Sequence, residues 1–276
     1  MSIQPGKILL TGVTGLVGAR LLPRLLAAGL DCCVLVRRRQ DAPAGVPALV
    51  GNLLQPASLA GVAQGITTVI HLAAMFRTSD TDLIWRSNLD GTRHLLAAVQ
   101  AQAPTAHFIL ASTSNVYSPD QLQPGREDDP VAPLPAYPAS KVAAEQELRA
   151  SGLTWTVLRF PFVYGDGDGH LEALPRHALA GSWHPAMRMG TIHHRDIATA
   201  MHLALTGALD GRIVNIADEA PISIYELAQL VGESIPPSAQ PLANPWYLQS
   251  DCSLARSLGF QPTVRTVYQA VREQLM

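Results

Sequence analysis

Three glycines near the start of the chain, in the stretch TGVTGLVG, constrain its fold more than any other feature. They follow an apolar run at 7–12, which is typical of a buried strand, and they open a helical pattern at 16–29. In a strand–turn–helix unit, Gly12 permits the tight turn, Gly15 lets the backbone approach a pyrophosphate, and Gly18 allows close helix–strand packing. The helix N-terminus would offer free N–H groups and a positive dipole end to the phosphates. The stretch therefore predicts a dinucleotide-binding turn rather than a purely structural glycine-rich one.

The rest of the first 160 residues alternates short apolar runs with longer helical patterns. The patterns predict strands at 32–36, 68–74, 107–112 and 154–160, and helices at 82–102 and 138–151. Strands that alternate with helices indicate βαβ units and a parallel sheet with helices on both faces. We therefore expect an α/β fold of the Rossmann type, with a doubly wound parallel sheet.

The alternation loosens after residue 165. Helical patterns recur at 195–206 and 223–233, and a strand pattern recurs at 211–217. We expect an NAD(P)-binding domain over 1–165 and a small C-terminal substrate-binding cap over 166–276. Elements that return from the second part to complete the sheet would make this boundary discontinuous.

The composition excludes several classes of partner. A net charge of −2 over 276 residues argues against a general nucleic-acid or membrane-surface binder. No apolar run reaches the roughly 18–20 residues of a membrane span, and the N-terminal MSIQPGKILL lacks the pattern of a signal peptide. Cys32, Cys33 and Cys252 form no CxxC pair, so we expect a reducing, cytoplasmic setting.

The end of the second predicted strand indicates which dinucleotide binds. An acidic residue there would bind the ribose 2′-hydroxyl of NAD, whereas an arginine suits the 2′-phosphate of NADP. Arg37 is the first residue after the strand, and Asp31 lies at its opposite end. We therefore expect NADP to be favoured over NAD. The alternative is that the arginines at 37–39 form a solvated loop and either cofactor binds.

Tyr137 and Lys141 lie four residues apart in YPASK, so they share one face of the predicted helix. Lys141 is one of only two lysines beside 18 arginines, which suggests that a compact ammonium is needed there. A phenol with a pKa of ~10 is too weakly ionised to act as a base at neutral pH. A unit charge ~4 Å away, at an effective dielectric constant of ~20, contributes ~4 kcal/mol, or up to ~3 pK units. Lys141 and an oxidised nicotinamide could thus lower the pKa of Tyr137 toward the working pH, as general acid–base catalysis requires.

Further motifs follow one another in a recognisable order over most of the chain. They are TGVTGLVG at 11–18, GNL at 51–53, HLAA at 71–74, NLDGT at 88–92, STSNVY at 112–117, REDDPVAPLPAYPASK at 126–141, LRFPFVYG at 158–165, IHHRDIATA at 192–200 and LGFQP at 258–262. Together they resemble the extended short-chain dehydrogenase/reductase family, also called the NAD-dependent epimerase/dehydratase family. Two positions depart from the family pattern, because Asn52 replaces the usual Asp at the adenine and Thr113 replaces the commoner Ser.

The resemblance implies a catalytic trio of Thr113, Tyr137 and Lys141. Tyr137 would act as general acid and base, and Lys141 would also hold the nicotinamide ribose hydroxyls. Thr113, with Ser112 or Ser114 as the next candidates, would hydrogen-bond the substrate oxygen as charge develops on it. The residues implied to bind the cofactor are Gly12, Thr14, Gly15, Leu16, Val17, Gly18, Arg37, Asn52, Leu53, Leu72, Ala73, Ala74, Asn88, Tyr137, Lys141, Pro161 and Val163.

Two polar segments look like metal sites but do not predict one. His193, His194 and Asp196 lack a further spaced ligand. GDGDG at 165–169 lacks the rest of a twelve-residue calcium loop and its final Glu. We expect no metal, and we expect GDGDG to be a flexible loop past the active site. Arg188 could contact an anionic substrate.

Three functions are compatible with this resemblance. The first is hydride transfer to or from a small or medium carbonyl or alcohol. The second is epimerisation, dehydration or reduction of a nucleotide sugar. The third, a non-catalytic dinucleotide sensor, is disfavoured because both Tyr137 and Lys141 are present.

The length and charge of the C-terminal cap favour the first function. Only 26 residues, 166–191, separate VYG from IHHRD, and Arg176 and Arg188 are their only cations. A nucleotide-sugar enzyme would have a longer cap with more positive charge for the diphosphate. Simple dehydration is also disfavoured, because Ser114 and Asn115 follow Thr113 where a dehydratase would carry an acid. We expect a small-molecule substrate and a possible homodimer, through the helices that carry Asn88 and Tyr137.

Overall fold

The computed structural model describes residues 6–276 and contains a sheet of seven strands in the order β10-β6-β5-β4-β1-β2-β3. These strands are β1 (Lys7–Thr11), β2 (Cys32–Val36), β3 (Ala48–Val50), β4 (Ile66–His71), β5 (His107–Thr113), β6 (Thr154–Phe160) and β10 (Arg212–Asn215). All their pairings are parallel. The strand order reverses at β1, which lies between β2 and β4, and ligands of such sheets bind in the crevice beyond that point. The predicted Rossmann-type fold is confirmed.

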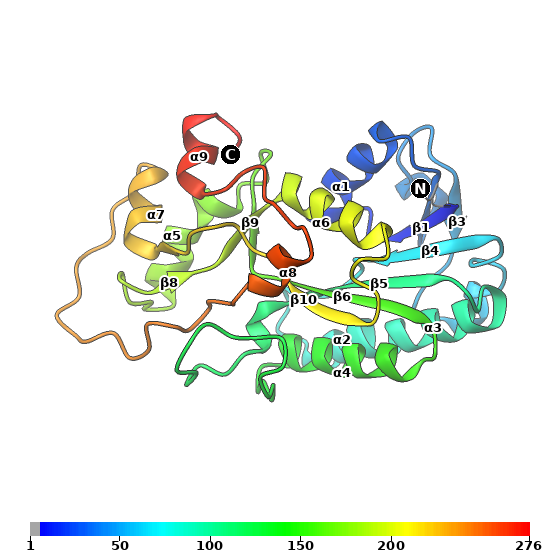
Figure 1. Cartoon of the computed structure of the whole chain (residues 1–276), viewed down its shortest axis with the longest axis horizontal. Helices are drawn as coiled ribbons and strands as arrows, with labels where there is room; N and C mark the ends of the chain where they lie inside the picture. Colours follow the sequence, from blue (N-terminus) through cyan, green and yellow to red (C-terminus); the bar gives the residue numbers. More distant parts are fainter. Residues whose placement is uncertain (1–5) are drawn as a thin grey trace.

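Helices cover both faces of the sheet (Figure 1). On one face lie α1 (Leu16–Ala27) and α6 (His194–Leu205), and on the other lie α2 (Thr81–Trp85), α3 (Gly91–Gln102) and α4 (Ala136–Ala150). Leu21 and Leu25 of α1 pack with Met201 of α6 in the first core, and Leu95 of α3 packs with Leu148 of α4 in the second. The strands are apolar on both sides because each face has its own core.

The C-terminal cap has a separate apolar core at the end of the sheet (Figure 1). Its elements are α5 (His170–Ala180), α7 (Ile224–Leu230), α9 (Val267–Arg272), and the strand pairs β7 (Phe162–Tyr164) with β9 (Thr191–His193) and β8 (Arg188–Met189) with β11 (Ile222–Ser223). The short helix α8 (Ser253–Ser257) lies beside β10. Leu171, Ile224 and Val267 are among the residues of this core.

Two elements from the second half of the chain belong to the sheet domain. The strand β10 pairs with β6, and α6 packs against α1. The division at residue 165 itself stays a prediction. Among residues 6–276, no helix is both long and apolar enough to cross a membrane. The first five residues of the stretch considered for a signal peptide lie outside the described range.

The long helix predicted at 82–102 is interrupted. A π-helical turn, η3 (Arg86–Asp90), separates α2 from α3. The Thr92 hydroxyl donates to the Asn88 carbonyl at 2.6 Å, which supports the widened turn. Such turns are common at functional sites, and this one presents Asn88 to neighbouring elements. Three 3₁₀ turns, η1 (Arg39–Asp41), η2 (Pro56–Leu59) and η4 (Ser114–Val116), complete the secondary structure.

Candidate active site

The glycine turn after β1 brings two backbone segments unusually close. Gly12 has a φ of 75°, and a Cβ added there would lie 2.6 Å from the Ala73 nitrogen. A Cβ on Gly18 would collide with the Gly12 carbonyl oxygen. Only glycine fits either position, because the clashes would be with backbone rather than with a movable side chain. The turn therefore packs α1 tightly onto β1 and leaves its outer side open.

The N-terminus of α1 begins at that open side. Gly15 is its N-cap residue, and no side chain within residues 6–276 caps it. The first N–H groups of a helix have no intrahelical partner, and they carry the positive end of the dipole. Gly15 and Thr14 both line a cleft at this edge of the sheet. A phosphate group would be favoured there.

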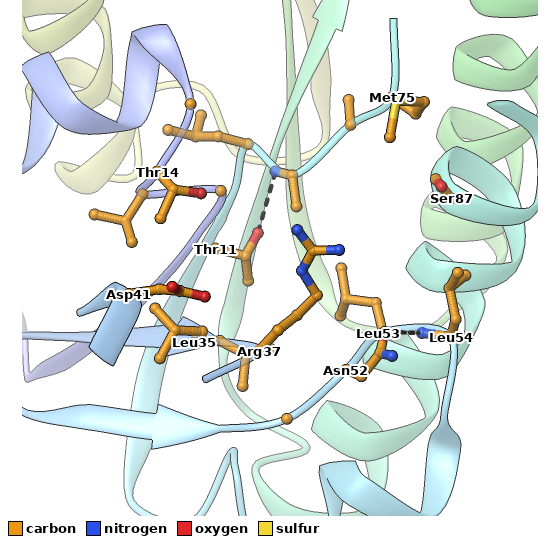
Figure 2. A pocket seen from close by; sticks show the side chains of 18 residues that line it. Thr11, Thr14, Leu35, Arg37, Asp41, Asn52, Leu53, Leu54, Met75 and Ser87 are labelled. Atoms are coloured by element: carbon orange, nitrogen blue, oxygen red, sulfur yellow. Dashed lines mark hydrogen bonds between the residues drawn. The ribbon is translucent and has the colours of Figure 1, made fainter. Parts of the chain in front are cut away.

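The cleft runs from the glycine turn across β2 and β4 (Figure 2). Nine of the cofactor residues expected from the sequence line it: Gly12, Thr14, Gly15, Arg37, Asn52, Leu53, Leu72, Ala73 and Ala74. Its lining does not extend to Leu16, Val17, Gly18, Pro161, Val163, Tyr137 or Lys141 within the described chain. Sequence reasoning missed three polar or soft residues of the lining, Asp41, Met75 and Ser87. Only Asp41 had a usable signal, since it follows Arg37 by one short turn.

The charged residues of the cleft are Arg37 and Asp41, and they differ in their partners. Asp41 accepts hydrogen bonds from Arg38 at 3.0 and 2.9 Å, and the hydrogen bond from Arg38 holds the pKa of Asp41 below its usual value. Arg37 extends into the cleft and makes no ion pair with any residue in 6–276 (Figure 2). The carboxylate is thus already neutralised, whereas the guanidinium remains available to an anion.

A buried histidine fixes the floor of the cleft. Thr92 donates to the Asn88 carbonyl, so its oxygen accepts from His71 Nε2 at 3.0 Å. Nδ1 of His71 then accepts from Thr11 Oγ1 at 2.7 Å, and Thr11 accepts from Ala73 N at 3.3 Å. Burial lowers the pKa of His71 to about 3, so the ring is neutral. The network assigns this tautomer and joins β1, β4 and α3.

Asn88 lies behind the wall of the cleft. It is fully buried, and it accepts from Met75 N at 2.7 Å and donates to Met75 O at 3.0 Å. It also donates to Ser140 Oγ at 3.0 Å, and Ser140 donates to the Tyr137 carbonyl at 2.7 Å. Asn88 therefore connects the loop after β4 to the catalytic helix, and Ser87 takes its expected place on the cleft surface.

The three expected catalytic residues come from two elements that pack together, β5 with η4 and α4. Thr113 ends β5, and its Oγ1 accepts from Asn115 N at 3.1 Å, which leaves its hydroxyl proton free to donate. Tyr137 lies in the first turn of α4 and is half-buried, and Lys141 follows one turn later and is 2% exposed. The helix positions the phenol above the ammonium on one face.

Burial controls the ionisation of this pair. It raises the pKa of Tyr137 to about 12 and lowers the pKa of Lys141 to about 8, while the Glu145 carboxylate opposes the latter shift. The sequence argument expected Lys141 to lower the pKa of Tyr137, and it omitted desolvation. In the protein alone desolvation dominates. The phenol is therefore a proton donor at neutral pH until further positive charge enters the site.

The histidine and aspartate residues of the late motif have structural partners. His193 bonds to the Leu275 carbonyl at 2.8 Å, and Asp196 accepts from Thr263 N and Val264 N at 2.6 and 2.9 Å. His194 bonds to Asp168 at 2.8 Å. These groups tie the start of α6 to the C-terminal segment.

The GDGDG segment is anchored, in contrast to the flexible loop expected from the sequence. Asp166 pairs with Arg24 at 2.6 Å, and its N–H donates to the Leu275 carbonyl at 2.9 Å. Asp168 is held by His194 from the other side. Arg188, the cation considered for an anionic substrate, lies 3.6 Å from Glu226.

A parallel sheet with a glycine turn, an open helix N-terminus and an adjoining cleft defines a Rossmann-fold, nicotinamide-dinucleotide-binding protein. A model of the NAD dependent epimerase/dehydratase family matches residues 8–217. The chain belongs to this family of NAD-dependent oxidoreductases and epimerases, and the resemblance seen in the sequence is confirmed.

Similar proteins include both reductases and epimerases. The chain is 31% identical to a ceramide reductase of Caulobacter vibrioides, with 71% of this chain and 60% of that protein covered. It is 28% identical to a UDP-glucose 4-epimerase of Azospirillum brasilense, with 83% and 79% covered. An Agrobacterium tumefaciens short-chain dehydrogenase/reductase with bound NAD has the same fold, with a TM-score of 0.80, 24% identity, and coverage of 97% and 95%.

Proposed function

We propose that this protein is an NADP(H)-preferring oxidoreductase that transfers hydride to or from a carbonyl or alcohol, with Tyr137 as the general acid and base. The observation that carries the proposal is the Tyr137–Lys141 pair on α4, with Lys141 buried one turn below the phenol and β5 packed alongside. A sensor protein would not need a buried ammonium beside a phenol. The substrate, the cofactor preference and the role of Tyr137 are all parts of the proposal.

The cofactor, when bound, supplies or accepts the hydride. Thr113 donates its free hydroxyl proton to the substrate oxygen as negative charge develops there. In reduction Tyr137 gives its proton to that oxygen, and in oxidation it takes the proton back. Lys141 stabilises the resulting phenolate through its positive charge, and a pKa of about 8 keeps most of the ammonium protonated at neutral pH.

The preference for NADP rests on the charges of the adenine end of the cleft. Arg37 is free of ion pairs in the described chain, whereas Asp41 is held by Arg38. A 2′-phosphate would pair with the free guanidinium. A ribose 2′-hydroxyl would instead need a free carboxylate, and the only one at hand is engaged. The homodimer and the cytoplasmic setting stay predictions.

The test is a spectrophotometric assay of the purified chain with NADPH and a panel of ketones and aldehydes. UDP-glucose and a dTDP-sugar are incubated in parallel and analysed for epimerised or dehydrated product. We expect NADPH oxidation with a carbonyl compound, and its loss by about 10²-fold or more in Tyr137→Phe. Conversion of a nucleotide sugar, with no carbonyl compound reduced, would overturn the proposal in favour of an epimerase, the activity named for the Azospirillum relative.

A further inference from the structure

An aromatic side chain packs directly against the catalytic tyrosine. The ring centroids of Phe76 and Tyr137 lie 4.5 Å apart with an angle of 47° between the ring planes. Phe76 is nevertheless 52% exposed, so much of its ring faces solvent beside the phenol. A large apolar surface next to a reacting group is available for contact with the substrate body.

The backbone around Phe76 is held in place from both sides. Both backbone polar groups of Met75 are bonded to Asn88, which is tied through Ser140 to the first turn of α4. Arg77 donates to His170 Nε2 at 2.5 Å, and its guanidinium lies 6.0 Å from the Phe76 ring. The exposed ring is therefore positioned in advance, which lowers the entropic cost of any contact that it makes.

The contacts continue from Phe76 to the C-terminal cap. His170 begins α5, and its Nδ1 bonds to the Val163 carbonyl at 3.3 Å. Its ring lies 5.8 Å from the ring of Phe162 on β7. A chain of contacts thus runs from Tyr137 through Phe76, Arg77 and His170 to Phe162. We call this set the aromatic wall.

The cations near the site have protein partners. Arg77 is bonded to His170, and Arg188 lies 3.6 Å from Glu226. A nucleotide diphosphate would have to compete for both. An uncharged hydrocarbon group needs no such partner, and it gains free energy by covering the exposed face of Phe76.

We infer that the substrate carries an aryl or alkyl body next to its carbonyl, and that Phe76 is the side chain of the aromatic wall that selects for it. The inference rests on the proposed function, because it concerns the carbonyl compound turned over at Tyr137. Phe76 acts on binding and not on proton transfer. Its removal therefore weakens apolar compounds and leaves small polar ones unaffected.

The experiment is titration calorimetry of the protein saturated with NADP⁺, with 4-phenyl-2-butanone as the probe. The oxidised cofactor has no hydride to give, so the readout is binding alone. Dihydroxyacetone and UDP-glucose are the polar comparison ligands. The variants are Phe76→Ala and Phe76→Leu, and the control is Leu179→Ala, an exposed apolar residue in the last turns of α5.

We expect 4-phenyl-2-butanone to bind more tightly than dihydroxyacetone, and Phe76→Ala to raise its Kd about tenfold, which equals 1.4 kcal/mol. Phe76→Leu should recover most of the affinity, and Leu179→Ala should match the parent protein. No binding of the aryl ketone, tighter binding of UDP-glucose, or equal affinity in Phe76→Ala would each overturn the inference. Binding of the ketone without its reduction by NADPH would leave the inference standing and overturn the proposed function instead.

Discussion

Glu145 accepts two hydrogen bonds from Arg159, at 2.7 Å from Nη2 and 3.2 Å from Nε, one helical turn after Lys141. Ser112 also donates to this carboxylate, and both charged side chains are almost completely buried. Arg159 continues to the Tyr117 hydroxyl at 3.0 Å, which donates to Asn215 at 2.7 Å. The network joins α4, β5, β6 and β10 beneath the catalytic pair.

Glu145→Gln should lower the free energy of unfolding by roughly 3–5 kcal/mol, because it leaves the Arg159 charge buried without its counterion. Urea unfolding of the purified chain measures this quantity. The matched control is Glu147→Gln on the same helix, whose exposed pair with Arg93 at 2.7 Å should be worth less than about 1 kcal/mol. Equal losses in the two variants would contradict the assignment of a buried, costly pair.

The affinity for NADP⁺ should fall as the pH rises through about 8. Burial lowers the pKa of Lys141 to about 8, so the ammonium is charged below that pH and loses its proton above it. Dissociation constants measured between pH 7 and 9.5 should break near 8 in the parent protein. Lys141→Met should bind more weakly and show no break. An identical break in Lys141→Met would assign the titration to another group.

Arg37→Ala should raise the Kd of NADPH about 10- to 100-fold, the range expected when a charge-assisted hydrogen bond is lost. The Kd of NADH should change little, because its adenosine ribose carries no 2′-phosphate. Fluorescence titration with both reduced cofactors measures the two constants. Arg39→Ala is the control, since this neighbouring arginine does not line the cleft. Equal loss for both cofactors in Arg37→Ala would disprove recognition of the phosphate.

Asp218→Asn should stabilise the protein more at pH 8 than at pH 5. Burial raises the pKa of Asp218 to about 8, and its Oδ1 has no hydrogen-bond partner within residues 6–276. Between pH ~4 and 8 the carboxyl ionises in the unfolded chain and stays protonated in the folded one, so the parent loses stability as the pH rises. Asparagine does not titrate, and its amide oxygen can still accept from Thr191.

Thermal unfolding at the two pH values checks this prediction, with an expected gain of at least about 3 °C in Tm at pH 8. Glu219→Gln is the adjacent control. A hydrogen bond from Arg265 lowers the pKa of Glu219, so its removal should act in the opposite direction. A Tm difference between Asp218→Asn and the parent that is the same at both pH values would show that the carboxyl does not titrate in this range.

The sequence by itself determined the order of strands and helices, the glycine turn and the family. These depend on local patterns: apolar runs for buried strands, spacing of three or four for helix faces, and glycines where a Cβ would strike the backbone. Arg37 could be placed at the end of β2 for the same reason. Such signals lie within a few residues of the element that they define.

Only the tertiary structure decided the interruption of the helix at Asn88, the raised pKa of Tyr137 and the contact of Phe76 with that phenol. Asn88 bonds to Met75 and Ser140, which lie 13 and 52 residues away in the chain. Phe76 and Tyr137 are equally remote in sequence. Desolvation and long-range hydrogen bonds depend on which elements pack together, and no local spacing encodes that. The chemistry of the site is therefore set by the fold, although its residues can be read from the sequence.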